Sequence, residues 1–195
     1  MPSIFVTGPV RSGKSRFAEA LARERGGDVL YVATARADPD DAEWSARIAH
    51  HVERRPAHWR TIETARADVA PLAAVVRDAP VELTLIVDSL GTWLGDRMSG
   101  LIDARADFDQ RDVAALETET NEVVDALLAA RAYAIVVGEE VGWGIVPAYP
   151  SGRAFRDVLG RAQQRLAAGS LAAYLIVSGF AIDLHAHGRP ITGAP

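Results

Sequence analysis

A glycine-rich stretch near the amino terminus constrains this chain more than any other feature: residues 8–15 read Gly-Pro-Val-Arg-Ser-Gly-Lys-Ser. The stretch fits the Gly-x-x-x-x-Gly-Lys-Ser phosphate-loop pattern with no mismatch. An apolar run, Ile4 to Val6, precedes it and a helix-like segment follows, as the pattern requires. The alternative is a plain glycine-rich turn. In that case the match in spacing, in the Lys-Ser pair and in the flanking elements would all be accidental. We therefore predict a phosphate-binding loop and a fold built around it.

Each residue type in this loop suits the binding of a nucleotide triphosphate. Glycines allow the backbone to curl so that successive N–H groups point at the anion, and the following helix adds the positive end of its dipole. Lys14 can reach the β- and γ-phosphates and is a candidate catalytic residue, while the Ser15 hydroxyl can hold Mg²⁺. The predicted nucleotide-binding residues of the loop are Gly8, Pro9, Val10, Arg11, Ser12, Gly13, Lys14 and Ser15.

Composition excludes several other classes of protein. The length of 195 residues suits one domain, and a formal net charge of −5 argues against general nucleic-acid binding. The absence of cysteine excludes disulfides, thiolate metal sites and a cysteine nucleophile. No apolar run approaches the ~20 residues of a membrane span, and the amino terminus has no signal-like region. We expect a cytoplasmic enzyme without a membrane span.

Apolar, strand-like runs alternate with helical segments, which predicts a single α/β domain with a mostly parallel sheet flanked by helices. Strands are expected at residues 3–7, 28–34, 59–63, 83–88, 133–137 and 174–178. Helices are expected from the phosphate loop to Gly26-Gly27, at residues 40–54, 69–78, 89–98 and 112–131, and from residue 151 onward. Residues 99–112 are polar with weak apolar periodicity, which is typical of a surface excursion.

Asp88 ends the apolar strand expected at residues 83–88. A carboxylate at the carboxyl end of such a strand can coordinate the Mg²⁺ held by Ser15, directly or through water. Apolar strands that end in an acid are common, but the combination with a phosphate loop is specific. We predict that Asp88 binds the nucleotide through the metal ion.

The helix expected at residues 40–54 has an apolar face. Trp44, Ile48 and Val52 recur every four positions, which predicts that this face packs on the rest of the molecule. His51 lies near this face and is interpreted as a structural residue.

A second face of the same helix is polar and contains Glu43, Arg47, His50 and Arg54, at spacings of four, three and four. Two guanidinium groups around an imidazole suit the binding of a phosphate beside a nucleophile or proton carrier. A solvated helix face is the alternative, and periodicity alone favours it.

Three further groups of residues are candidates. Glu63 ends the strand expected at residues 59–63, and we predict that it binds the nucleotide. The glycine-rich loop at residues 138–147 leaves the carboxyl end of a strand, where open parallel sheets place ligands, although a plain connection is equally compatible. His185 and His187 can chelate a metal, but a solvated terminus is favoured.

With these residues in hand, the chain resembles the adenosylcobinamide kinase and adenosylcobinamide-phosphate guanylyltransferase (CobU/CobP) family of cobalamin biosynthesis. The resemblance runs from Val6 to about Gly179. It rests on the phosphate loop, on residues 30–35, and on Arg47-Ile48-Ala49-His50-His51 followed by Arg55-Pro56-Ala57-His58-Trp59. It continues through Val87-Asp88, Glu140-Val141-Gly142-Trp143-Gly144-Ile145-Val146-Pro147 and Phe155-Arg156-Asp157. The histidine segment and the Glu-Val-Gly loop are its most specific parts.

The resemblance implies a RecA-like phosphate-loop fold, two activities and a homotrimer. Such an enzyme phosphorylates adenosylcobinamide with ATP or GTP, then transfers GMP from GTP to adenosylcobinamide phosphate and releases pyrophosphate. The resemblance makes His50 the carrier of GMP, and we take Arg47 and Arg54, with Mg²⁺, to offset the developing charge. Because His50 and the phosphate loop must meet one nucleotide, we expect the loop after residue 34 to move or a neighbouring subunit to contribute.

The chain departs from the family pattern at three places. Glu139 stands where the family usually has asparagine, Ala148-Tyr149 where it often has Glu-Asn, and Gln163 where it usually has asparagine. An ionised glutamate accepts hydrogen bonds but donates none, whereas asparagine does both. A contact of this position to nucleotide or corrinoid is therefore expected to weaken. These departures bear on efficiency and substrate choice more than on reaction type.

Two other functions are compatible with the same loop. The first is a phosphate-loop kinase of another small alcohol without nucleotidyl transfer. The second is a nucleotide-operated binding module that recruits a protein partner. Both alternatives include the phosphate loop. They differ from the bifunctional enzyme because His50 would not carry GMP.

Overall fold

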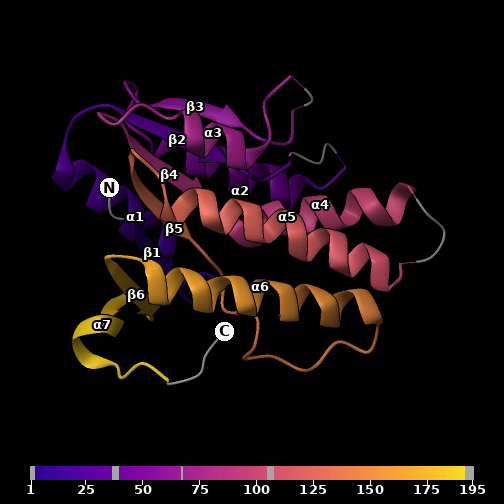
Figure 1. Ribbon diagram of the computed structural model, residues 1–195. Helices are drawn as coiled ribbons and strands as arrows, with labels where there is room; N and C mark the ends of the chain where they lie inside the picture. The colour runs from indigo at the N-terminus through magenta and orange to yellow at the C-terminus, as the bar shows by residue number, and fades with distance from the viewer. Residues whose placement is uncertain (1–2, 37–39, 67, 105–107, 192–195) are drawn as a thin grey trace.

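The computed structural model describes residues 3–36, 40–66, 68–104 and 108–191, with only the backbone of Arg47 and Ala104. A seven-stranded sheet in the order β3-β2-β4-β5-β1-β6-β7 forms its centre (Figure 1). Neighbouring strands are parallel except β6 and β7. The strands are β1 (Ile4–Thr7), β2 (Val29–Ala33), β3 (Arg60–Glu63), β4 (Thr84–Asp88), β5 (Tyr133–Val137), β6 (Ala172–Val177) and β7 (Phe180–Asp183).

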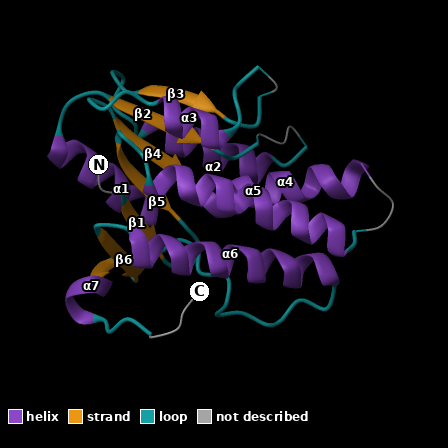
Figure 2. Cartoon of the chain, viewed as in Figure 1, coloured by secondary structure: helices purple, strands orange, loops and turns teal. Residues whose placement is uncertain are grey.

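Helices cover both faces of this sheet (Figure 2). They are α1 (Lys14–Arg25), α2 (Ala42–Glu53), α3 (Leu72–Asp78), α4 (Leu90–Ala104), α5 (Gln110–Leu128), α6 (Pro150–Gly169) and α7 (Leu184–His187). Side chains of β4 alternate between the faces, so that Leu85 and Val87 pack against α3–α6, whereas Ile86 packs on the side of α1. The single α/β domain and its mostly parallel sheet are confirmed.

The strand order brings the phosphate loop, after β1, and Asp88, at the end of β4, to the same edge of the sheet. β5 lies between β1 and β4, and Val137 is level with both Val6 and Asp88. Two strand spacings correspond to about 10 Å. The ends of β1 and β4 therefore flank the same part of the carboxyl edge, and this single intervening strand agrees with the expected RecA-like arrangement.

The prediction of a surface excursion at residues 99–112 is wrong for residues 99–104 and 110–112, which are helical, and residues 105–107 lie outside the described part of the chain. α4 continues to Ala104, and α5 already begins at Gln110. Asp109 caps α5, because its side chain accepts from the backbone N–H of Arg111 while the Asp112 side chain accepts from the N–H of Asp109. α4, α5 and α6 extend past the carboxyl edge of the sheet (Figure 1). The last turns of α4 and the first turn of α5 face no strand, which explains the weak apolar periodicity of residues 99–112.

Two further element boundaries differ from expectation. α3 begins after Pro71, so Val69 precedes the helix instead of starting it. β7 was not predicted because it is a short edge strand in which Phe180 and Ile182 remain 76% and 43% exposed. Four residues form too short a run for their alternation to be recognised with certainty in the sequence.

α2 is attached to the domain differently from the other long helices. None of its described side chains belongs to either hydrophobic cluster. Trp44 and Ile48 are half-buried, but Val52 is 52% exposed, so the prediction that it packs is wrong. Polar contacts described below also connect this helix to the rest of the domain.

Candidate nucleotide site

The phosphate loop joins the end of β1 to the start of α1 with a strongly curved backbone. Gly8 and Gly13 have φ angles of 153° and 104°, and Arg11 has 58°. A Cβ atom at Gly8 would collide with the carbonyl oxygen of Ile176 in β6, so only glycine fits there. The Gly8 carbonyl oxygen accepts from the Glu140 N–H at 3.1 Å, which ties the loop to the segment after β5.

Several donors of the loop converge where an anion would lie. Lys14 is buried, and its Nζ donates to the Pro9 carbonyl oxygen at 3.0 Å, folding the ammonium over the loop. The buried Ser12 Oγ has no hydrogen-bond partner among the described residues. Gly13 precedes α1 without a capping side chain, so the first N–H groups of the helix are available to a ligand. This arrangement fits a phosphate group.

Asp88 lies at the end of β4 with a mostly buried carboxylate. The Tyr31 hydroxyl donates to Asp88 Oδ2, and the Arg55 guanidinium lies 3.6 Å from the centre of the Tyr31 ring. Burial and the Asp88 charge raise the pKa of Tyr31 well above its usual value, so the phenol remains a donor. His51 Nδ1 is 4.0 Å from the same carboxylate oxygen.

The donor set suits a magnesium ion that a nucleotide brings with it. Asp88 supplies carboxylate oxygens, and the half-buried Ser15 supplies a hydroxyl, which are the hard ligands that Mg²⁺ prefers. Among the described residues, no group of three His, Cys, Asp or Glu side chains can hold a metal by itself. His185 and His187 are therefore not part of such a cluster. Phosphate oxygens and water would complete the coordination of Mg²⁺.

The two adjacent histidines of α2 have different surroundings. His50 is exposed and has no hydrogen-bond partner in the described part of the chain, whereas His51 is half-buried between Asp88 and Arg54. Burial lowers the pKa of His51, Asp88 acts in the opposite direction, and Arg54 adds to the lowering. The interpretation of His51 as a packed residue agrees with this position, although its neighbours are polar instead of apolar.

The cationic face predicted around His50 is not assembled in this structure. Arg54 turns toward α1, where its Nη2 lies 3.0 Å from Oε1 of the buried Glu19. Glu43 lies 4.0 Å from Arg11 of the phosphate loop. The side chain of Arg47 lies outside the described part of the chain. The predicted roles of Arg47 and Arg54 remain predictions.

Glu63 is exposed at the same edge of the sheet as Asp88. It is level with Ala33 of β2, which in turn is level with Asp88, so two strand spacings separate the two acids. Pro9 is half-buried and Val10 is 71% exposed, so their expected contribution comes from the backbone of the loop. Nucleotide binding by Glu63 remains a prediction.

Sequence reasoning missed the buried acid Glu19. Its side chain is 1% exposed and also lies 3.5 Å from Arg23, whose guanidinium in turn donates to the Arg54 carbonyl oxygen at 3.0 Å. An acid on the inner side of a helix carries no periodic signal of its own. Its partner, Arg54, is far away in the sequence, so only the tertiary structure reveals the link between α1 and α2.

Replacing Arg54 by alanine is expected to lower the free energy of unfolding by roughly 1–3 kcal/mol, because a buried carboxylate loses a close partner. Chemical denaturation with urea measures this change. Arg66→Ala is the matched control, since Arg66 and Asp68 form a fully exposed pair and its loss should leave stability unchanged. Equal stability of Arg54→Ala and the wild type would contradict the buried-pair interpretation.

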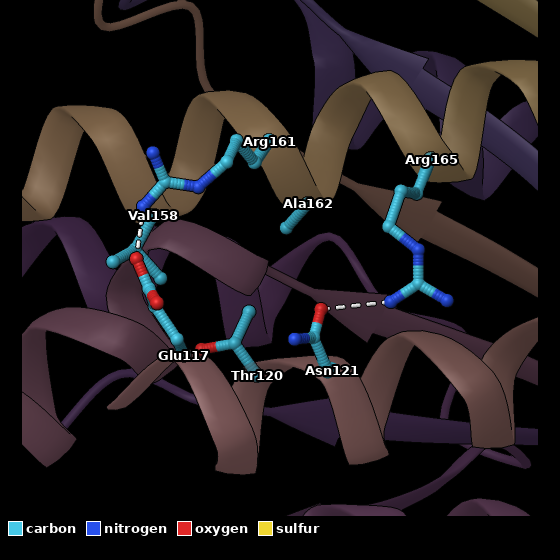
Figure 3. Close-up of a pocket in the computed structure, with 7 residues that line it drawn as sticks. All are labelled: Glu117, Thr120, Asn121, Val158, Arg161, Ala162 and Arg165. Atoms are coloured by element: carbon cyan, nitrogen blue, oxygen red, sulfur yellow. Dashed lines mark hydrogen bonds and ion pairs between the residues drawn. The ribbon is translucent and has the colours of Figure 1, made fainter. Parts of the chain in front are cut away.

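A cavity between α5 and α6 lies away from the loop. Its volume is about 390 Å³, and Glu117, Thr120, Asn121, Val158, Arg161, Ala162 and Arg165 line it (Figure 3). Arg161 pairs with Glu117, and Arg165 donates to Asn121 at 2.7 Å. These arginines of α6 are already paired within the chain. We therefore interpret the cavity as part of the packing between α5 and α6, and not as a ligand site.

No helix of the described residues has the length and apolar character needed to cross a membrane. Among solved structures, an ATPase of a bacterial type III secretion system aligns with a TM-score of 0.50 and 12% identity, covering 98% of this chain and 59% of that chain. This likeness concerns the fold alone.

Comparison with known sequences adds the family. The model of the cobinamide kinase / cobinamide phosphate guanyltransferase family matches residues 4–184. The bifunctional adenosylcobalamin biosynthesis protein CobU of Salmonella typhimurium is 41% identical over 192 residues, covering 93% of this chain and 98% of that protein. CobU of Escherichia coli is 38% identical with the same coverage. CobP of Pseudomonas aeruginosa is 37% identical over 187 residues, covering 95% of this chain and 98% of that protein. The chain belongs to the cobinamide kinase / cobinamide phosphate guanyltransferase family.

Proposed function

We propose that this chain is a bifunctional enzyme of cobalamin biosynthesis that phosphorylates adenosylcobinamide and then converts the phosphate to adenosylcobinamide-GDP. The observation that supports this most is the complete phosphate loop, in which Lys14 folds over the loop and the buried Ser12 hydroxyl has no partner among the described residues. The family match and the relatives' names supply the identity of the acceptor. ATP and GTP as substrates agree with action in the cytoplasm.

In the kinase step, the alcohol oxygen of adenosylcobinamide attacks the γ-phosphorus of ATP or GTP. The bond from that phosphorus to the β–γ bridging oxygen breaks, a nucleoside diphosphate leaves, and the alcohol proton is released. Lys14 and the loop N–H groups hold the phosphates and stabilise the charge that moves to the leaving oxygen. Positioning of this kind supplies most of the catalysis in phosphoryl transfer.

In the second activity, an imidazole nitrogen of His50 attacks the α-phosphorus of GTP. The bond to the α–β bridging oxygen breaks, pyrophosphate leaves, and GMP remains on His50 as a phosphoramidate. A phosphate oxygen of adenosylcobinamide phosphate then attacks this phosphorus. The P–N bond breaks, the product carries a new P–O–P bond, and His50 is regenerated.

Mg²⁺, when bound by Ser15 and Asp88, would neutralise phosphate charge during both reactions. His50 must approach the loop, and motion of α2 is one route, because none of the described side chains of α2 belongs to either hydrophobic cluster. A contribution from a neighbouring subunit is the other route, and it agrees with the homotrimer that we propose. Multi-angle light scattering on the purified protein tests the trimer.

The function is tested by incubating purified protein with adenosylcobinamide, Mg²⁺ and either ATP or GTP, followed by chromatography and mass spectrometry. We expect adenosylcobinamide phosphate with at least one nucleotide, and adenosylcobinamide-GDP plus pyrophosphate with GTP. Phosphate without the GDP product would favour a kinase alone. No turnover together with tight GTP binding and a recruited protein would favour a binding module.

A further inference from the structure

Glu139 follows β5 and reaches across the carboxyl edge of the sheet to the start of α4. The Ser89 hydroxyl donates to its Oε1, and the Gly91 N–H donates to its Oε2 at 2.9 Å. A Cβ atom at Gly91 would collide with the Glu139 carboxylate, so helix and side chain are in close contact. One carboxylate therefore holds both the residue after Asp88 and the first turn of α4.

Hydroxyl groups continue this contact to the end of β2. Thr34 Oγ1 accepts from the Ser89 N–H and donates to the Ser89 carbonyl oxygen, both at 2.7 Å. The hydroxyls of Ser89 and Thr92 lie 2.9 Å apart. Ser89 is thus fixed through its backbone by Thr34 and through its side chain by Glu139. The Asp88–Ser89 corner has little freedom while these bonds persist.

The backbone of Glu139 is also held in place, because Gln163 Nε2 of α6 donates to its carbonyl oxygen at 3.0 Å. A carboxylate suits the position, since both partners are donors and the amino-terminal end of a helix favours negative charge. Burial raises the pKa of Glu139, while the hydrogen bond from Ser89 and the nearby Lys14 lower it. The expected weakened contact to substrate is therefore only part of the account: this glutamate has partners within the chain.

We propose that Glu139 is a positioning residue that holds the Asp88–Ser89 corner, so that Asp88 keeps its carboxylate at the metal side of the phosphate loop. This inference rests on the metal site of the proposed function. Residues that orient a metal ligand typically change metal affinity by about 10- to 100-fold when they are removed. Glu139 acts through Ser89 and Asp88 and touches no nucleotide in this account.

The test measures binding of a fluorescent GTP analogue as free Mg²⁺ is varied, with a second titration in EDTA. Glu139→Ala is expected to raise the Mg²⁺ concentration for half-maximal binding by about 10-fold or more. Binding in EDTA should change much less, because Glu139 contacts Ser89 and Gly91 and affects the phosphate loop through its charge near Lys14. Glu139→Gln keeps the side-chain length, and its amide can donate to Ser89 Oγ while its oxygen accepts from Gly91, so it should restore most of the Mg²⁺ response.

Ser89→Ala removes one of the two side-chain contacts and should shift the Mg²⁺ response in the same direction. Combined with Glu139→Ala, it should add little, since both changes break one contact. Glu122→Ala, at an exposed position of α5, is the control for loss of an acid. If Glu139→Ala does not fold, Glu139→Gln and Ser89→Ala decide.

Three results would overturn the proposal. The first is a Mg²⁺ response of Glu139→Ala that equals the wild-type response. Ser89→Ala takes its place if Glu139→Ala does not fold. Binding can fall equally in EDTA, which would indicate general damage to the loop. Glu139→Gln can also fail as badly as Glu139→Ala. If wild-type GTP binding ignores Mg²⁺ altogether, the proposed metal site fails as well, which separates that failure from one confined to Glu139.

Discussion

Replacing His50 by alanine is expected to abolish the guanylylated form of the enzyme and to leave phosphorylation of adenosylcobinamide nearly unchanged. Alanine offers no nitrogen lone pair to attack the α-phosphorus, and loss of a covalent nucleophile lowers rates by roughly 10⁴-fold or more. In the kinase step the alcohol oxygen attacks the γ-phosphorus directly, so this step does not need the imidazole. Because His50 is exposed, its truncation should cost little stability.

This result is measured with α-labelled GTP in the absence of corrinoid. The wild type should retain label through denaturation, and the bond should be labile in acid and stable in alkali, as a phosphoramidate is. His51→Ala is the informative control, because His51 lies 4.0 Å from Asp88 and is the histidine nearer the predicted metal site. Label that persists in His50→Ala and disappears in His51→Ala would assign the carrier to His51 instead.

The fold was largely predictable because its signals are local. The phosphate loop is contiguous, and strands such as β5, whose predicted bounds Tyr133–Val137 are confirmed, are continuous apolar runs because both faces of the sheet are covered. The extents of α4 and α5 were not predictable, since their outer turns lie beyond the sheet. Periodicity reports burial, and it fades where a helix has water on most sides.

The candidate site was predictable only in part, for a related reason. Residues 8–15 and Asp88 are recognisable because each lies at the end of an apolar strand in a known pattern. The contacts of Glu19 with Arg54, and of Glu139 with Ser89, join residues 35 and 50 positions apart. No periodicity connects such pairs, so the partners that hold α2 and the Asp88–Ser89 corner emerge from the tertiary structure alone.

Lys14→Ala is expected to impair both reactions, whereas His50→Ala affects only one. The Lys14 ammonium is the buried positive charge of the loop, and removing a group that stabilises transition-state charge typically costs about 10²- to 10³-fold in rate. In both reactions we expect the loop to hold the triphosphate that is attacked, so a loop that holds it poorly should slow phosphorylation and guanylylation together. Stability should change little, because the variant also removes the cost of burying a charge.

The matched control for this variant is Arg16→Ala, which removes an exposed cation from the same helix. Initial rates of adenosylcobinamide phosphorylation and of enzyme labelling, together with thermal unfolding, separate catalysis from folding. Lys14→Ala should unfold near the wild-type temperature and lose both rates, whereas Arg16→Ala should keep both. If Lys14→Ala loses phosphorylation but still becomes guanylylated at the wild-type rate, the two reactions use different nucleotide sites. His50 would then never need to approach the phosphate loop, and a shared nucleotide would no longer require motion of α2.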